Sequence, residues 1–262
     1  MSATPADIDQ DVADRGAPRA VTGYVADTIS FSNVDGPGNR FVVFMQGCNF
    51  DCVACHNPQT IPGHEPLEGY HPQHLHVDQL LDDIRRAAPF IRGVTASGGE
   101  ATQQSEFLRA LFTAIKNDPD LARLTCFVDS NGATARSVWD RLAPVTDGAM
   151  IDLKCFDGDI HREMTGQPND LVLASIEHLA GLGLLHETRL LLLAGVNDDD
   201  ELLLRTAEWL AAVDPEMRIK LIRFRSHGAR PQTPPLVEPT HEALVHAADV
   251  LRSVAPFEIC TV

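Results

Sequence analysis

Residues 47–58 read GCNFDCVACHNP and hold half of the six cysteines of the chain, at positions 48, 52 and 55. Three thiols and a histidine in one segment bounded by glycine and proline are typical of a bound metal or prosthetic group. Four kinds of site compete: a disulfide, a zinc knuckle, a haem attachment site, and an iron–sulfur cluster with one iron free of protein ligands.

The spacing of the ligands separates these alternatives. CVACH matches the C-x-x-C-H pattern of haem attachment, but this reading leaves Cys48 unexplained and the chain shows no export signal. Zinc could take three cysteines and His56, yet His56 directly follows Cys55, whereas zinc motifs bring the second ligand pair from a distant knuckle. We favour a [4Fe–4S] cluster, because three thiolates leave one iron open to a substrate.

The bulk composition excludes several classes of function. The chain has 262 residues, a net charge of −16 and a pI of about 4.9. An acidic surface disfavours binding to nucleic acids and to anionic membranes, which need a cationic face. No apolar run has the length of a membrane span. We expect a cytoplasmic protein with reduced thiols, which disfavours the disulfide. Residues 1–20 read as a disordered acidic tail, and residues 21–262 as one core domain with a C-terminal helix.

Apolar runs alternate with amphipathic segments along the core. The runs expected to be parallel strands buried on both faces are RFVVFMQG, GVTASGG, LTCFVDSNG, AMIDLK, ETRLLLLAG and RIKLIRF. Helical stripes are expected over residues 77–87, 107–115, 171–182, 201–213 and 241–254. Six strand–helix units predict an α/β fold with a parallel sheet, as a partial or full barrel.

Polar motifs follow these strands where each strand ends. GGE (residues 98–100), DSNG (129–132), DLK (152–154) and AGVND (194–198) each come after a different strand. Glycine, asparagine and aspartate are also ordinary turn formers. Because parallel α/β folds bind ligands at the carboxyl ends of their strands, several such loops together indicate an active-site face.

The ordered motifs resemble the activating enzymes of glycyl radical enzymes, in the radical S-adenosylmethionine superfamily. The match runs through DGPGNRFVVFMQGCNFDCVACHNP, VTASGGEAT, DSNG, MIDLK and HREMTG, and covers about residues 21–224. The resemblance implies a partial (β/α)6 TIM-like barrel, the radical SAM fold. It also implies that Cys48, Cys52 and Cys55 bind a [4Fe–4S] cluster, whose open iron binds S-adenosylmethionine. The compact chain lacks the ferredoxin-like insert of some relatives, since no cysteine lies between Cys55 and Gly98.

The resemblance also assigns roles to residues outside the cysteine motif. Gly98, Gly99 and the Glu100 carboxylate would receive the ammonium group of the cosubstrate, and Lys154 and Arg189 would bind its carboxylate and ribose. A Na+ or K+ ion would lie near Asp129, Met150 and Asp152, and a histidine near the adenosyl group matches His227. Further contacts are implied for Ala54, His56 and Leu153. Relatives carry an aromatic residue at the position of Ala54, so its contact would be through the backbone.

The implied activity is that of an oxidoreductase. It cleaves S-adenosylmethionine reductively to a 5′-deoxyadenosyl radical, which abstracts a hydrogen from a glycine of a partner enzyme. Asp35 would contact the glycine-bearing loop of that partner, a flavodoxin or ferredoxin would supply the electron, and the protein would be a monomer. The alternatives are a radical enzyme for a small molecule or peptide, and a non-catalytic metal-binding or electron-transfer protein. Cys126, Cys155 and Cys260 lack ligand spacing and are expected in the core.

Overall fold

The computed structural model describes residues 21–63 and 70–262. The predicted tail at residues 1–20 lies outside the described residues. Within them, nine strands form one sheet, in the order β3-β1-β2-β4-β5-β6-β7-β8-β9. The strands are β1 (Thr22–Ser32), β2 (Arg40–Met45), β3 (Gln73–His76), β4 (Gly93–Gly98), β5 (Thr125–Ser130), β6 (Gly148–Leu153), β7 (Leu185–Leu192), β8 (Arg218–Arg223) and β9 (Glu258–Thr261).

The six strands expected from the sequence are adjacent and parallel. They are β2, β4, β5, β6, β7 and β8, and β9 extends the parallel part of the sheet. The other two strands, β1 and β3, pair antiparallel at the opposite edge. The predicted partial barrel is therefore confirmed, with three strands that the sequence patterns did not indicate.

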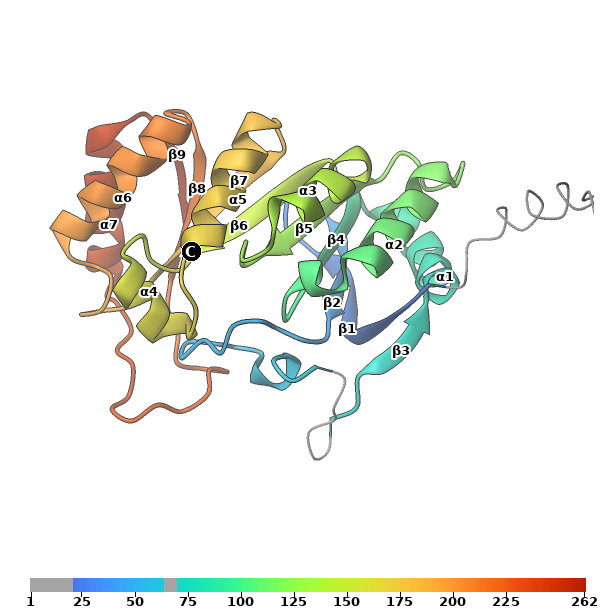
Figure 1. The fold of residues 1–262 in the computed structure, drawn as a ribbon, viewed down its shortest axis with the longest axis horizontal. Coiled ribbons are helices and arrows are strands. Elements are labelled where there is room, and N and C mark those ends of the chain that lie inside the picture. The colour runs from blue at the N-terminus through green and yellow to red at the C-terminus, as the bar shows by residue number, and fades with distance from the viewer. Residues whose placement is uncertain (1–20, 64–69) are drawn as a thin grey trace, which may run out of the picture.

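The helices cover one side of the curved sheet. They are α1 (Val77–Ala87), α2 (Ser105–Asn117), α3 (Arg136–Leu142), α4 (Gly158–Thr165), α5 (Asp170–Gly181), α6 (Asp200–Val213) and α7 (His241–Val254). Figure 1 shows most of them along the outer side of the sheet, with α4 set apart, beside the loop that follows β2. The five predicted helices are confirmed within two residues at their ends, and α3 and α4 are additional.

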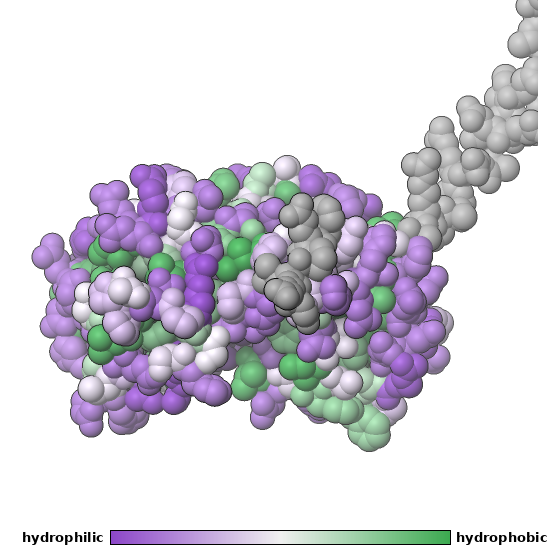
Figure 2. Space-filling model, turned by 90° about the horizontal axis from the view of Figure 1, so that it is seen from below, coloured by the Kyte–Doolittle hydropathy of each residue, from purple (hydrophilic) through white to green (hydrophobic). Residues whose placement is uncertain are grey.

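The core lies between these helices and the sheet. Residues on the inner faces of α1 and α2, including Leu80, Ile84 and Leu111, are fully buried against β2 and β4 residues such as Val43 and Val94. Burial of such side chains supplies most of the free energy of folding. The face seen in Figure 2, on the side of the loop after β2 and away from most helices, is largely hydrophilic, with hydrophobic residues in small groups. Within the described residues, no helix is long and apolar enough to cross a membrane.

The three remaining cysteines do not share one environment. Cys126 in β5 and Cys155 after β6 are buried, as expected for small apolar side chains in a core. Cys260 is exposed, so its predicted core position is wrong. The reason is that β9 is the edge strand of the sheet, and only one of its four residues is even partly buried.

Candidate active site

The cysteine loop, residues 46–57, follows β2 and is fixed at its start by backbone hydrogen bonds. The amide of Gly47 donates to the Thr60 carbonyl at 2.9 Å, and the amide of Cys48 donates to the Ile61 carbonyl at 3.1 Å. Gly47 has a φ of +97°, a conformation that residues with a side chain rarely adopt. The glycine therefore allows the chain to turn sharply just before the first cysteine.

The three cysteines of the loop line one cavity of about 270 Å³. Burial raises the pKa of Cys48 to about 12, although the amide of Phe50 donates to its sulfur. Burial likewise raises the pKa of Cys52 to about 11, opposed by the charge of Lys154. Both side chains are therefore neutral thiols at pH 7, unless a bound cationic group favours the thiolate.

The two glycines after β4 bring a second turn against this loop. A Cβ atom on Gly98, whose φ is +113°, would lie 2.2 Å from the Met45 nitrogen, and one on Gly99 would lie 2.3 Å from the Gly47 carbonyl oxygen. The amide of Glu100 donates to that same Gly47 carbonyl at 2.8 Å. Only glycine permits this close approach, and both glycines line the cavity.

The carboxylate of Glu100 does not lie in the cavity wall. Its side chain is buried, at 1 % exposure, and accepts four hydrogen bonds. They come from the Thr102 amide and hydroxyl at 2.8 and 2.6 Å, the Ser130 hydroxyl at 2.8 Å and the Asn131 amide at 2.7 Å. All four donors belong to the protein, and a contact between this carboxylate and a ligand's ammonium group stays a prediction. The carboxylate joins the turn after β4 to the loop after β5 beneath the cavity.

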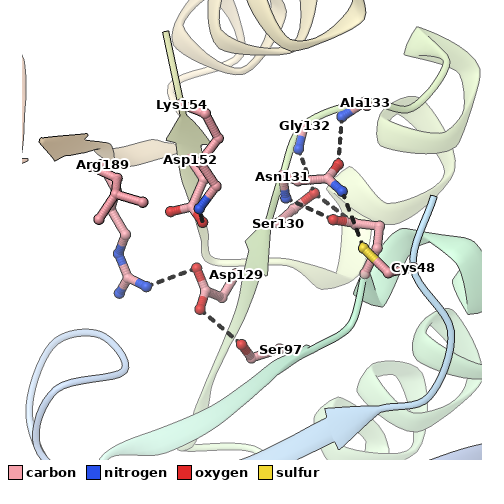
Figure 3. Close-up of polar contacts among 12 residues, drawn as sticks. Cys48, Ser97, Asp129, Ser130, Asn131, Gly132, Ala133, Asp152, Lys154 and Arg189 are labelled. Carbon is pink, nitrogen blue, oxygen red and sulfur yellow. Dashed lines mark hydrogen bonds and ion pairs between the residues drawn. The ribbon is translucent and has the colours of Figure 1, made fainter. Parts of the chain in front are cut away.

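Charged side chains from β5, β6 and β7 converge beside the cysteines (Figure 3). Arg189 Nη1 donates to Asp129 Oδ1 at 2.8 Å, and the Ser97 hydroxyl donates to Asp129 Oδ2 at 2.9 Å. Lys154 Nζ lies 2.7 Å from Asp152 Oδ2. Asp129, Asp152 and Lys154 line the cavity, whereas Arg189 is not part of its wall and lies behind Asp129.

Burial and pairing determine the charge states of this group. Burial raises the pKa of Asp129, against the lowering effect of Arg189. Burial lowers the pKa of Lys154 and of Arg189, but the neighbouring carboxylates outweigh burial and raise both above their ordinary values. Both cations stay protonated, so the cavity presents fixed positive charge next to two carboxylates.

The three residues predicted to surround a monovalent cation lie together, but they contact the protein's own cations. Arg189 Nη2 lies 3.0 Å from the sulfur of Met150, which is fully buried, and also holds Asp129. Lys154 holds the carboxylate of Asp152. Among the described residues, no group of three or more His, Cys, Asp or Glu side chains is arranged to hold a metal ion.

The remaining predicted residues lie at different distances from the cavity. Ala54 and His56 line it. Leu153 is buried in the core of the sheet, and His227 is exposed on the loop after β8. Asp35 is outside the cavity wall, in the loop before β2, where it accepts a hydrogen bond from the Ser32 hydroxyl.

Two sets of functional contacts were missed in the sequence analysis. Asn131 bridges the site: its side-chain amide donates to the Asn49 side-chain oxygen at 2.8 Å and points at the Cys48 sulfur, 3.8 Å away. Arg230 and Gln232, after β8, donate to carbonyls of the cysteine loop. DSNG offered a signal for Asn131, since an amide after a strand can reach a neighbouring loop, but RPQTPP offered none for Arg230.

Comparisons with known proteins agree with this arrangement. The sequence model of the radical SAM superfamily matches residues 42–207. The pyruvate formate-lyase-activating enzyme of Streptococcus mutans is 34% identical over 79% of this chain and 80% of its own length. A provisionally named glycyl-radical enzyme activating enzyme of Haemophilus influenzae is 34% identical over 77% of this chain and 82% of its own length.

Solved structures share the fold at low sequence identity. Streptococcus suis SuiB bound to S-adenosylmethionine aligns with a TM-score of 0.63 at 13% identity, over 83% of this chain and 48% of SuiB. Escherichia coli QueE aligns with a TM-score of 0.57 at 13% identity, over 92% of this chain and 94% of QueE. These similarities support the architecture.

Proposed function

This chain belongs to the radical SAM superfamily, and we propose that it activates a partner glycyl radical enzyme by removing a hydrogen atom from a glycine of that partner. Membership of the superfamily implies a [4Fe–4S] cluster and S-adenosylmethionine. The observation that carries the proposal is that three cysteines, two glycines and the charged ends of β5 and β6 line a single cavity. A pure electron carrier would not need the charged half of that cavity.

The cysteine loop fits a cluster with three protein ligands. Cys48, Cys52 and Cys55 would each bind a different iron, so their sulfurs need not converge on one point. Because burial raises the pKa values of Cys48 and Cys52, iron would displace a proton from each of these thiols on binding. The Phe50 amide would remain a donor to the Cys48 sulfur, a contact that tunes such clusters.

The rest of the cavity suits the polar groups of S-adenosylmethionine. The backbone at Gly98 and Gly99 would accept from its ammonium group, and the Lys154 ammonium would attract its carboxylate. Ala54 and His56 would contact the adenosyl part from the loop. Leu153 would act through its backbone, because its side chain is buried in the core. Arg189 would act by holding Asp129, and His227 is the least supported contact, because its side chain is exposed.

A Na+ or K+ ion would enter this site only by displacing existing contacts. Asp129 and Asp152 carry the charge, and Met150 pairs with Asp129 across the sheet and lies on the same strand as Asp152. Oxygen ligands are what a hard monovalent cation requires, so main-chain oxygens would serve better than the Met150 sulfur, which Arg189 already contacts.

When bound, the cluster and S-adenosylmethionine supply one electron and a 5′-deoxyadenosyl radical that takes the glycine hydrogen. The protein's own residues bind and orient these groups and keep water away from them. Asp35 would contact the partner's glycine loop from the loop before β2. A flavodoxin or ferredoxin would donate the electron, and the activase would act as a monomer.

The test is an electron-spin resonance experiment. Reduced, reconstituted protein is mixed anaerobically with S-adenosylmethionine and a glycyl radical enzyme encoded nearby in the source genome. We expect a glycyl radical with a Cα-hydrogen splitting, absent with the Cys52→Ala variant. Release of 5′-deoxyadenosine stimulated by a small metabolite, with no radical on any partner, would contradict the proposal.

A further inference from the structure

Residues 225–232, which follow β8 and are called the strap here, lie against the outer side of the cysteine loop. The His56 ring Nε2 is 2.7 Å from the Arg225 carbonyl oxygen. The amide of Arg230 donates to the Cys55 carbonyl at 3.3 Å, and the Gln232 side chain donates to the Val53 carbonyl at 3.1 Å. The strap therefore joins the end of the sheet to a loop about 170 residues earlier, across the side of the barrel that no strand closes.

Arg230 makes the densest set of these contacts. Its Nη2 donates to the Asp51 and Cys52 carbonyls, at 2.7 Å each, and its Nη1 lies 2.7 Å from the Asp51 carboxylate. A planar guanidinium can hold two carbonyls and a carboxylate in one fixed geometry, which a lysine ammonium cannot. The carboxylate of Asp51 is 69% exposed, so that ion pair contributes little compared with the carbonyl contacts.

The opposite side of the same loop is held by α4. The amides of Asp51 and Val53 donate at 2.9 Å to the carbonyls of Thr165 and Met164, at the end of that helix. The backbone around Cys52 thus has its donors bound by α4 and its acceptors bound by the strap. The backbone that carries Cys52 is therefore held on both sides, and Arg230 holds one of them.

We propose that Arg230 is a positioning residue for the iron–sulfur cluster, which it serves by fixing the carbonyls of Asp51 and Cys52 and by placing a positive charge beside the cluster loop. This rests on the cluster-binding part of the proposed function. Two consequences follow. Without Arg230, the cluster is lost more easily, because one edge of the loop is released. Its reduction potential also falls, because a nearby cation favours the more negative, reduced cluster.

The experiment compares Arg230→Gln and Arg230→Lys with a matched control, Arg252→Gln. Arg252 is also an arginine near an aspartate and a carbonyl, at 3.3 and 3.5 Å, but it lies on α7 and these partners, Asp249 and Ile259, belong to α7 and β9 instead of the cysteine loop. Each reconstituted protein is treated anaerobically with an iron chelator, and iron release is followed by absorbance. The midpoint potential is measured separately by titration with dithionite.

We expect Arg230→Gln to release iron about 10- to 100-fold faster than wild type, in line with the loss of an outer contact of a metal site. Its potential should fall below wild type, whereas Arg230→Lys should keep the potential nearer wild type while still releasing iron faster. Arg252→Gln should match wild type in both measurements. The unfolding midpoint of cluster-free protein is measured as well, because a purely structural role would lower that midpoint without moving the potential.

Wild-type iron release and potential in Arg230→Gln would overturn the proposal, as would a lowered unfolding midpoint with no change in either. Neither measurement needs a partner enzyme. A wild-type protein that holds a cluster but forms no glycyl radical would therefore refute activation, while leaving the Arg230 comparison decisive. A wild-type protein that takes up no cluster would overturn both.

Discussion

Two roles can be tested for the carboxylate of Glu100: binding of a ligand, as the resemblance implies, and stabilisation of the fold. If the carboxylate bound a ligand, Glu100→Ala would weaken binding of S-adenosylmethionine and leave the fold intact. In the structure the carboxylate instead accepts four hydrogen bonds below the cavity, two from backbone amides and two from hydroxyls. We therefore predict that Glu100→Ala mainly lowers the free energy of unfolding.

The magnitude follows from the donors that would lose their acceptor. The amides of Thr102 and Asn131 cannot turn away, and each buried amide without a partner costs about 1–3 kcal/mol. The hydroxyls of Thr102 and Ser130 can rotate to other acceptors and add little. Water entering the vacated space recovers part of the cost, so we expect a loss of about 3 kcal/mol from a total that is typically about 5–15 kcal/mol.

The assay is urea unfolding of the cluster-free protein under reducing conditions, followed by circular dichroism. Glu208→Ala on α6 is the control, because that glutamate is exposed, and it should change the free energy by less than about 0.5 kcal/mol. Glu100→Gln keeps one acceptor oxygen and should fall between the control and Glu100→Ala. Binding of S-adenosylmethionine is measured separately by anaerobic calorimetry. If Glu100→Ala kept wild-type stability but lost this binding, the reasoning would be refuted, and the carboxylate would be assigned to ligand binding.

Three further predictions concern other parts of the chain. Burial lowers the pKa of His161 below 6.5, so below about pH 6.5 the unfolded chain takes up a proton that the folded chain does not. The free energy of unfolding of the cluster-free protein, measured with urea, should then fall by up to about 1.4 kcal/mol per pH unit as the pH is lowered, and should fall less steeply in His161→Gln. Mass spectrometry after iodoacetamide treatment should find Cys260 alkylated first, because it is exposed. Cys48 should be protected from alkylation once the cluster is built. Equal labelling of Cys48 with and without iron would count against its role as a ligand. Asp35→Asn should reduce glycyl radical formation on the partner more than it reduces uncoupled release of 5′-deoxyadenosine, and an equal loss of both signals would place Asp35 in general folding.

The sequence patterns predicted the buried strands well and the edge strands poorly. A strand such as β2 is covered on both faces, so its residues from Phe41 to Met45 form a continuous apolar run that is easy to recognise. Strand β1, next to the edge strand β3, alternates fully and partly buried positions only in its first half, and the other edge strand, β9, has four residues, mostly exposed. The short helices α3 and α4, of seven and eight residues, hold too few turns to show a clear apolar stripe.

The motifs identified which loops form the site, but not which way each side chain points. The spacing of the cysteines and the position of GGE after a strand are local features, and the cysteines and both glycines line one cavity. Whether Glu100 faces that cavity or the layer below depends on Ser130 and Asn131, which come from a different strand. Such an orientation is a tertiary property, and no pattern within one segment determines it.

For the same reason, the side-chain contacts across the open side of the barrel could not be predicted from the sequence. Parallel pairing aligns the carboxyl ends of β2, β4, β5 and β6, so the cysteine loop, the glycine turn, Asp129 and Asp152 meet because neighbouring strands share a register. In the part of the chain that the structure describes, no strand pairing joins β1 to β8, and individual side chains make the connection. Lys220 on β8 donates to the Val34 carbonyl at 2.9 Å, at the end nearer Asp35, and Arg230 reaches the cysteine loop at the other end. A partner's glycine loop that enters between these two contacts would meet Asp35 on one side and the cluster loop on the other. Both contacts are made by single cationic side chains, neither of which belongs to a recognisable motif.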